Sequence, residues 1–258
     1  MGKSKIQWTE RTWNPVTGCS KISQGCVNCY AEVMSRRLKG MGQKKYQNGF
    51  RLSLHEETLS EPTKTSNPSM FFVCSMGDLF HKDVPFEFIN KVMATIDKCP
   101  QHTFQILTKR PYRMASYFRM ERDVPENVWI GTTVECAETV HRIEEVRSIG
   151  KYNTDGTKVR RFLSCEPLLS DLGDMDLKGI DLVIVGGESG QNARPMDKRW
   201  VLNIKRQCDE QGVVFFFKQW GTWGEDGMKR SKGANGCTID GRTYQDYPFG
   251  WKMKKELE

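Results

Sequence analysis

The sequence predicts an α/β fold: a partial (β/α) barrel of about six to seven mostly parallel strands, with a small Gly-rich C-terminal cap. Three observations lead to this prediction. Short and almost entirely apolar runs recur along the chain, amphipathic helical patterns follow most of them, and the length of 258 residues suits a single α/β barrel. Strands that are apolar on both faces are typical of parallel sheets covered by helices.

The strands are expected where the apolar runs lie. Six runs occupy residues 70–75, 103–107, 128–132, 161–165, 182–186 and 213–217, and a further strand is expected near residues 13–16. Helical spacing of apolar residues predicts helices over residues 85–99, 112–120, 137–149 and 198–211. The segment 167–178, between the fourth and fifth runs, is expected to form a loop.

The N-terminal part of the chain is expected to add one helix and one irregular segment. Apolar residues recur at i, i+3, i+4 and i+8 from Tyr30, which predicts a helix over residues 30–38 that Gly40 ends. Residues 41–69 are polar and contain two prolines, so we expect an irregular insertion.

The chain is expected to hold one large domain and one short extension. The barrel domain would cover residues 1–220, including the insertion, and the C-terminal extension residues 221–258. A hairpin is expected over residues 237–244, because the Asp240-Gly241 pair favours a type I′ turn.

Three cysteines, Cys19, Cys26 and Cys29, have the spacing C-x6-C-x2-C, and we call residues 19–29 the cysteine loop. Three thiolates without a local fourth ligand suggest a metal site with one open position, as in an iron–sulfur cluster that binds a substrate or cofactor. A closed zinc site would need a distant fourth ligand. The candidates for that ligand are Cys74, His55 and His81. Buried thiols without any metal are the third interpretation.

Basic residues concentrate around the cysteine loop. Residues 1–51 contain ten Lys or Arg against two Glu, a net charge of +8, whereas the whole chain carries +7. A basic surface beside a reactive site would attract an anionic partner, such as nucleic acid or an acidic redox protein. A solvated helix face with scattered lysines is the alternative interpretation.

Several classes of protein do not fit the sequence. No run of 18 apolar residues predicts a transmembrane helix, and the polar N-terminus does not resemble a signal peptide. The nine cysteines are expected to be reduced thiols or metal ligands of a cytoplasmic protein and not a disulfide framework.

Polar residues follow each of the six apolar runs. They lie at residues 75–78, 108–110, 132–135, 164–166, 186–189 and 218–220. Ligands of barrels and open α/β sheets bind at the C-terminal ends of the strands. We therefore expect these residues to converge on one site, with ordinary loop polarity as the alternative.

A three-cysteine loop after a first strand and before a helix resembles the radical S-adenosylmethionine (radical SAM) superfamily, over about residues 8–220. The chain is also similar, nearly end to end, to an uncharacterised three-Cys-motif family associated with phages and mobile elements. The motifs include Thr12-Trp13-Asn14-Pro15, Gly77-Asp78-Leu79-Phe80, Leu107-Thr108-Lys109-Arg110, Ser164-Cys165-Glu166-Pro167 and Gly186-Gly187-Glu188-Ser189. The first cysteine gap departs from the commonest radical SAM pattern, C-x3-C-x2-C.

The resemblance implies that Cys19, Cys26 and Cys29 hold a 4Fe–4S cluster whose fourth iron binds S-adenosylmethionine. Reductive cleavage of the sulfonium would give methionine and a 5′-deoxyadenosyl radical, which abstracts hydrogen from a substrate. Implied cofactor contacts are Tyr30, Gly77, Asp78, Thr132, Glu135, Glu166, Gly186, Gly187 and Glu188. Candidates for substrate contacts are Lys109, Arg110, Arg194, Lys218 and Trp220.

The substrate is expected to be a nucleic acid or nucleotide, in a modification or repair reaction, and a peptide or protein stays open. Implied partners are an electron donor such as flavodoxin or ferredoxin and a partner protein encoded nearby, with no membrane. Two other classes stay open: a zinc-stapled nucleic-acid-binding protein without catalysis, and a nucleotide hydrolase using Asp78 and Glu166 with a divalent metal. Cys74 and Cys165, each at a strand end, are expected to pack in the core.

Overall fold

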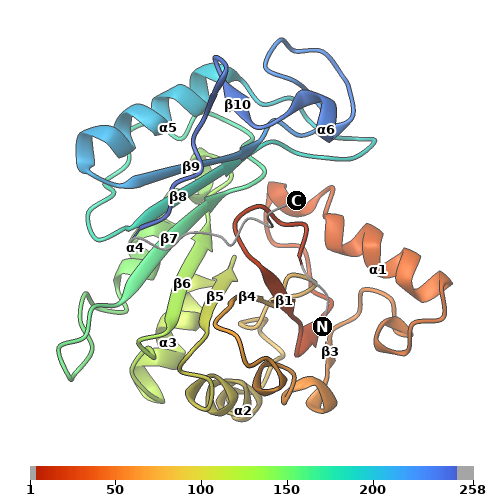
Figure 1. The fold of residues 1–258 in the computed structure, drawn as a ribbon, viewed down its shortest axis with the longest axis vertical. Helices are drawn as coiled ribbons and strands as arrows, with labels where there is room; N and C mark the ends of the chain where they lie inside the picture. Colours follow the sequence, from red (N-terminus) through yellow and green to blue (C-terminus); the bar gives the residue numbers. More distant parts are fainter. Residues whose placement is uncertain (1–3, 249–258) are drawn as a thin grey trace. The chain divides into compact units, whose positions relative to one another are not determined.

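The structure is a computed structural model that describes residues 4–248 (Figure 1). Residues 1–3 and residues 249–258, the end of the predicted C-terminal extension, lie outside the described part. Two compact units make up the chain: a first unit of Met1–Thr132 with Glu144–Arg160, and a second unit of Thr133–Ile143 with Arg161–Glu258.

The first unit contains four parallel strands. They are β1 (Arg11–Trp13), β4 (Met70–Val73), β5 (Thr103–Thr108) and β6 (Val128–Thr133), paired in that order. All residues of β4 and β6 are buried, as expected for strands covered on both faces. Helix α2 (Phe86–Asp97) follows β4, and helix α3 (Pro111–Met120) follows β5, with a proline at or just before the start of each.

The second unit contains three parallel strands, β7 (Arg160–Cys165), β8 (Leu182–Gly186) and β9 (Val214–Gln219), again in chain order. Helix α5 (Lys198–Gln211) connects β8 to β9 and has the predicted bounds. Its first turn is capped by the Asp197 carboxylate, and Gly212 ends it in the left-handed conformation at φ 67°.

The seven parallel strands follow one another in the order β1-β4-β5-β6-β7-β8-β9, which confirms the predicted α/β fold with a partial (β/α) barrel (Figure 1). The loop predicted over residues 167–178 is also confirmed, because no helix joins β7 to β8. The predicted hairpin is formed by β10 (Thr238–Ile239) and β11 (Arg242–Thr243). Its turn residues Asp240 and Gly241 have φ of 48° and 74°, as a type I′ turn requires. A one-turn helix, α6 (Lys232–Asn235), precedes the hairpin.

The predicted insertion 41–69 contains no α-helix and is largely irregular. It holds three 3-10 turns, η2 (Lys44–Tyr46), η3 (Glu56–Thr58) and η4 (Pro62–Lys64). The short strand β3 (Ser53–Leu54) pairs antiparallel with β2 (Val16–Thr17), a strand the sequence did not separate from β1. The break between β1 and β2 falls at Asn14-Pro15, where proline lacks the donor that a continuous strand needs.

Helix α1 (Tyr30–Gly40) has its buried side in a different place from the one its apolar spacing predicts. Ala31 and Ser35 are its buried residues, and Ala31 packs with Tyr46 and Met76. Tyr30 and Val33 are 56% and 65% exposed. The small side chains of Ala31 and Ser35 permit a close approach, and of the predicted apolar positions Leu38 packs, partly buried, against the same cluster.

The single helix predicted over residues 137–149 is wrong. The segment forms a 3-10 turn, η5 (Ala137–Thr139), and a separate short helix, α4 (Arg142–Arg147). The Thr139 hydroxyl accepts hydrogen bonds from the N–H groups of Glu135 and Cys136 at 3.1 and 3.2 Å. This capping box closes the first turn on itself, so the chain does not continue directly into a longer helix.

Within residues 4–248, the structure has no helix whose length and apolar character would let it span a bilayer.

Candidate functional site

The cysteine loop leads from β2 to α1 in the first unit. Cys26 ends the 3-10 turn η1 (Gln24–Cys26) and is buried, and Cys29 is the residue directly before α1. Burial raises the pKa of the Cys19 thiol to about 11, with Asp78 and Cys26 adding to the rise and Arg110 opposing it. Burial also raises the pKa of Cys29, while backbone N–H groups of the first turn of α1 and Lys109 lower it. Cys26 thus lies close enough to influence both other thiols.

Two glycines bring the cysteine loop beside the segment that follows β4. Gly18 and Gly77 form a parallel bridge, and the Gly18 N–H donates to the Met76 carbonyl at 2.9 Å. Gly18 has a φ of 78°, and a Cβ there would overlap the backbone carbonyl of Arg51. A Cβ on Gly77 would lie 2.9 Å from the Val16 carbonyl oxygen. Close backbone approach therefore restricts the positions of Gly18 and Gly77 to glycine.

Asp78 and Arg110 form a buried ion pair beside Cys19. The Arg110 Nη1 lies 2.7 Å from Asp78 Oδ2, and the two side chains are 12% and 7% exposed. Arg110 Nη1 also donates to the Cys19 sulfur at 3.5 Å. The loops after β4 and β5 thus meet the cysteine loop, as the pattern of polar strand ends predicted for this part of the chain.

The other predicted site residues of the first unit are placed differently. The Tyr30 hydroxyl donates to the Ser75 carbonyl, and its ring is largely exposed. The Thr132 side chain is fully buried and donates to the Thr108 carbonyl at 3.0 Å. Lys109 is half-buried. The Thr132 hydroxyl therefore bonds within the sheet itself, whereas the Tyr30 side chain, directly after Cys29, is 56% exposed.

The three predicted glutamates of the second unit each pair with a base. Glu135 Oε2 lies 2.9 Å from Arg142 Nη1, and the side chains are 0% and 8% exposed. Glu166 Oε1 lies 2.7 Å from Lys218 Nζ, and Glu188 Oε1 lies 2.6 Å from Arg194 Nη2. Arg194 also donates to Glu188 through its N–H and Nε at 2.8 and 2.9 Å.

Gly186, Gly187 and Trp220 pack at the ends of β8 and β9. A Cβ on Gly186 would lie 2.5 Å from Glu166 Oε1, and one on Gly187 would overlap the Trp220 carbonyl. Trp220 is 1% exposed, and its indole N–H donates to the Thr238 carbonyl at 2.8 Å. This burial favours a core role for Trp220 over the predicted contact with a substrate.

The three candidates for a fourth zinc ligand are occupied in other ways. His55 Nε2 lies 2.8 Å from the Thr17 hydroxyl, and His81 Nε2 lies 2.7 Å from the Ser20 hydroxyl. Cys74 is fully buried, and burial raises the pKa of its thiol to about 12. Among residues 4–248, no group of three or more His, Cys, Asp or Glu side chains is arranged to hold a metal ion.

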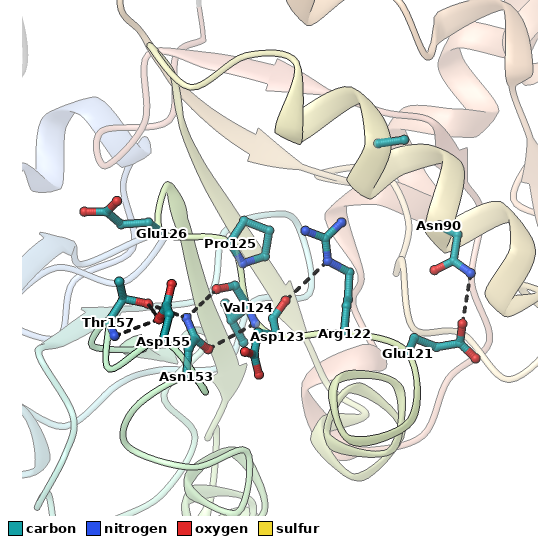
Figure 2. Close-up of a pocket in the computed structure, with 11 residues that line it drawn as sticks. Asn90, Glu121, Arg122, Asp123, Val124, Pro125, Glu126, Asn153, Asp155 and Thr157 are labelled. Carbon is teal, nitrogen blue, oxygen red and sulfur yellow. Dashed lines mark hydrogen bonds between the residues drawn. The ribbon is translucent and has the colours of Figure 1, made fainter.

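Figure 2 shows an open hollow of about 480 Å³ in the first unit, beside the segment that leads into β6. Its polar side chains bond to one another: Asn90 donates to Glu121 at 3.0 Å, and Asn153 donates to the Val124 carbonyl at 2.7 Å. The hollow lies at the N-terminal end of β6, whereas the predicted site residues follow the C-terminal ends of strands. None of those predicted residues lines it.

The model of a protein family described as "Protein of unknown function (DUF5131)" matches residues 3–248. The chain belongs to this family. A comparison with curated proteins gives no match.

Three solved structures that resemble the chain are all of spore photoproduct lyase. The complex with dinucleoside spore photoproduct is 11% identical with a TM-score of 0.49, and a mutant form with bound AdoMet and the same ligand is 12% identical with a TM-score of 0.48. A further mutant is 13% identical with a TM-score of 0.49. In each case the match covers 81% of this chain and 63% of the other. Similarities this distant carry no functional assignment, so the assignment rests on the residues of this chain.

The chemistry of the donors in the cysteine loop fits an iron–sulfur cluster. Three sulfur donors lie in one short loop, and thiolates are the ligands that such clusters use. An arginine N–H points at one of the sulfurs, a contact that stabilises negative charge on a ligand. All nine cysteines are free, so no disulfide competes for the three thiols.

Sequence reasoning missed Ser20 and Arg142, each of which contacts a predicted site residue. Arg142 is buried against Glu135 and the Thr133 carbonyl at 2.9 Å each. The signal for it was faint, because an arginine in a predicted amphipathic helix normally faces solvent. The Ser20 hydroxyl accepts a hydrogen bond from Arg110, which is 90 residues away in the sequence. No local sequence pattern predicts this contact.

Proposed function

We propose that this chain is a radical SAM enzyme, in which Cys19, Cys26 and Cys29 hold a 4Fe–4S cluster. One observation carries the proposal: the three thiols lie in one loop at the start of α1, where the ends of β4 and β5 bring a buried Asp78–Arg110 pair against Cys19. This is a partial (β/α) barrel with its sulfur donors at the strand ends where such folds bind ligands.

The cluster, when bound, would supply the electron that cleaves the sulfonium bond of S-adenosylmethionine and starts hydrogen abstraction from a substrate. Tyr30 offers an exposed ring for the adenine, directly after Cys29. Gly77 lets the segment after β4 pack directly against the backbone that leads into the cysteine loop. Glu166, Gly186, Gly187 and Glu188 remain our candidates for contacts from the second unit.

The three glutamates of the second unit differ in availability. Glu135 and Arg142 are both almost fully buried, so we assign them to holding the loop after β6. Arg194 is 33% exposed while its partner Glu188 is 5% exposed, and we propose the partly exposed guanidinium as a contact for an anionic ligand. Lys218 and Glu166 are 16% and 14% exposed, and we propose this pair for a polar contact with cofactor or substrate.

The substrate is proposed to be a nucleic acid or nucleotide that is modified or repaired. The support is the basic segment 1–51, with its net charge of +8. Phosphate contacts by lysine and arginine make binding strongly dependent on salt. The proposal also includes an electron donor such as flavodoxin or ferredoxin, a partner protein encoded nearby, a phage association and a cytoplasmic location. The nine free cysteines suit a reducing compartment.

The proposal is tested by reconstituting the purified protein with iron and sulfide without oxygen. We expect about four irons and four sulfides per chain in the wild type, and an electron paramagnetic resonance spectrum of the reduced cluster that changes when S-adenosylmethionine is added. Cys26→Ala is the loss variant, and Cys99→Ala, a buried cysteine of the same unit outside the loop, is the matched control. One tight zinc per chain and no cluster would replace the enzyme by the zinc-stapled nucleic-acid-binding alternative.

A further inference from the structure

The guanidinium of Arg110 joins three segments of the first unit that are far apart in the sequence. Nη1 donates to the Asp78 carboxylate at 2.7 Å and to the Cys19 sulfur at 3.5 Å. Nη2 donates to the backbone carbonyl and the hydroxyl of Ser20 at 3.1 and 3.0 Å. One side chain therefore ties the first cysteine and the residue after it to the loop that follows β4.

A buried carboxylate fixes the orientation of this guanidinium. Asp78 Oδ2 accepts from Arg110, and Oδ1 accepts from the Thr108 hydroxyl at 2.7 Å and the Phe80 N–H at 2.9 Å. The Thr108 hydroxyl in turn accepts from the Arg110 N–H at 2.9 Å. Because both oxygens of Asp78 are bonded and the pair is largely buried, Arg110 has little freedom to turn elsewhere.

The three cysteines are held by different means. Cys26 belongs to the turn η1, where its N–H donates to the Ser23 carbonyl at 3.0 Å, and Cys29 adjoins the first turn of α1. Cys19 belongs to no helix and is separated from Cys26 by six residues. Its position is set by Gly18 on one side and by Arg110 on the other.

We propose that Arg110, oriented by Asp78 and Thr108, is a positioning residue that holds Cys19 as a cluster ligand and raises the reduction potential of the cluster. This inference rests on the proposed function. It replaces the predicted role of Arg110 as a substrate contact, because the guanidinium is already committed to Asp78, Cys19 and Ser20. It also gives Asp78 a role in orienting Arg110 in place of a direct cofactor contact.

The direction of the potential follows from charge. Reduction adds an electron to the cluster, and a positive charge with an N–H donor at a ligand sulfur stabilises the more negative state. Removing the guanidinium therefore makes reduction harder and the midpoint potential more negative. Second-shell partners of this kind also support metal binding, and their loss typically costs about 10–100-fold in affinity.

The test compares Arg110→Gln and Arg110→Lys with the wild type and with Arg122→Gln. Arg122 is the matched control, because it forms a bidentate pair with Asp97 at 2.8 Å in the same unit and neither residue belongs to the cysteine loop. Each protein is reconstituted without oxygen, its iron and sulfide are counted, and its midpoint potential is measured by titration followed with electron paramagnetic resonance. Circular dichroism checks that each variant is folded.

We expect Arg110→Gln to hold less cluster and to have a more negative midpoint potential, while Arg122→Gln matches the wild type. Arg110→Lys keeps the charge but loses the fork, so its potential is expected to fall between them. If Arg110→Gln does not fold, Arg110→Lys decides, and a potential equal to that of the wild type would overturn the inference. Equal potentials and iron contents in a loaded wild type and a folded Arg110→Gln would overturn this inference and leave the proposed function standing. A wild type that takes up no cluster would overturn the proposed function first.

Discussion

The two units carry different kinds of polar side chain near the ends of their strands. In the first unit, three sulfur donors lie in one loop of a basic segment. Beside this loop is one long-range ion pair, Asp78–Arg110, whose residues are 32 positions apart in the sequence. In the second unit, each predicted glutamate has its own base, and two of the three pairs, Glu135–Arg142 and Glu188–Arg194, join residues only 7 and 6 positions apart. The first unit thus has three thiols that can bind a positively charged group, whereas the predicted glutamates of the second unit are already paired with bases.

This difference indicates which unit can bind a metal cation more favourably. A thiol that burial keeps neutral gains from a metal cation, whereas a paired carboxylate must first give up its partner. The first unit is accordingly where we propose that the cluster binds.

The largest stability effect is expected where the second unit buries its ion pair. Glu135→Ala leaves the Arg142 guanidinium buried without its carboxylate, which costs about 3–5 kcal/mol. The control Glu210→Ala breaks an exposed i, i+4 pair with Arg206 and costs about 0.5 kcal/mol or less. Urea unfolding measures both. Equal costs would show that the balanced acids of the second unit are mere surface pairs.

The next effect concerns the glycine that sets the entry to the cysteine loop. Gly18→Ala combines a left-handed backbone with overlap against the Arg51 carbonyl, and about 3 kcal/mol is expected from the two costs together. Gly173→Ala in the second unit is the matched control, since Gly173 has a φ of 67° but nothing within 4 Å of an added Cβ. It is expected to lose about 1 kcal/mol. Similar losses of the free energy of unfolding for both variants would mean that the entry to the cysteine loop can shift at little cost.

A smaller effect is expected from pH, and it separates the units. Burial lowers the pKa of His55, His81 and His102 below 6.5, and all three lie in the first unit. The unfolded chain then binds protons more readily than the folded one, so stability is complete above pH 6.5 and falls as the pH drops below it. Hydrogen exchange at pH 8 and pH 5.5 is expected to show loosening of the first unit, and His102→Gln reduces it. Equal loosening in the second unit, whose one histidine is His141, would contradict this account.

The fold was predictable because nearly every strand is a continuous apolar run that alternates with a helical pattern. The exceptions have local causes: Thr139 closes a turn where one helix was predicted, and Ala31 and Ser35 give α1 a packed face that apolar spacing does not mark. The cysteine loop and the loops after β4 and β5 were also visible as polar strand ends.

The partners of the site residues were not predictable from the sequence. The sequence predicts Arg110 as a substrate contact, and only the structure shows that Asp78, Cys19 and Ser20 contact it. Trp220 is a second example, since it is predicted to contact the substrate but is packed against Phe217 at 5.0 Å between ring centroids. Chemistry can be read from residue types, but whether a side chain is free depends on contacts between distant segments.

The central claim is that Cys19, Cys26 and Cys29 hold a cluster that cleaves S-adenosylmethionine. The most direct measurement is the release of 5′-deoxyadenosine from S-adenosylmethionine by the reconstituted, dithionite-reduced protein without oxygen. We predict that the wild type and Cys99→Ala release it and that Cys26→Ala does not. Absence of release from a wild type that carries its cluster, or equal release from Cys26→Ala, would contradict the claim.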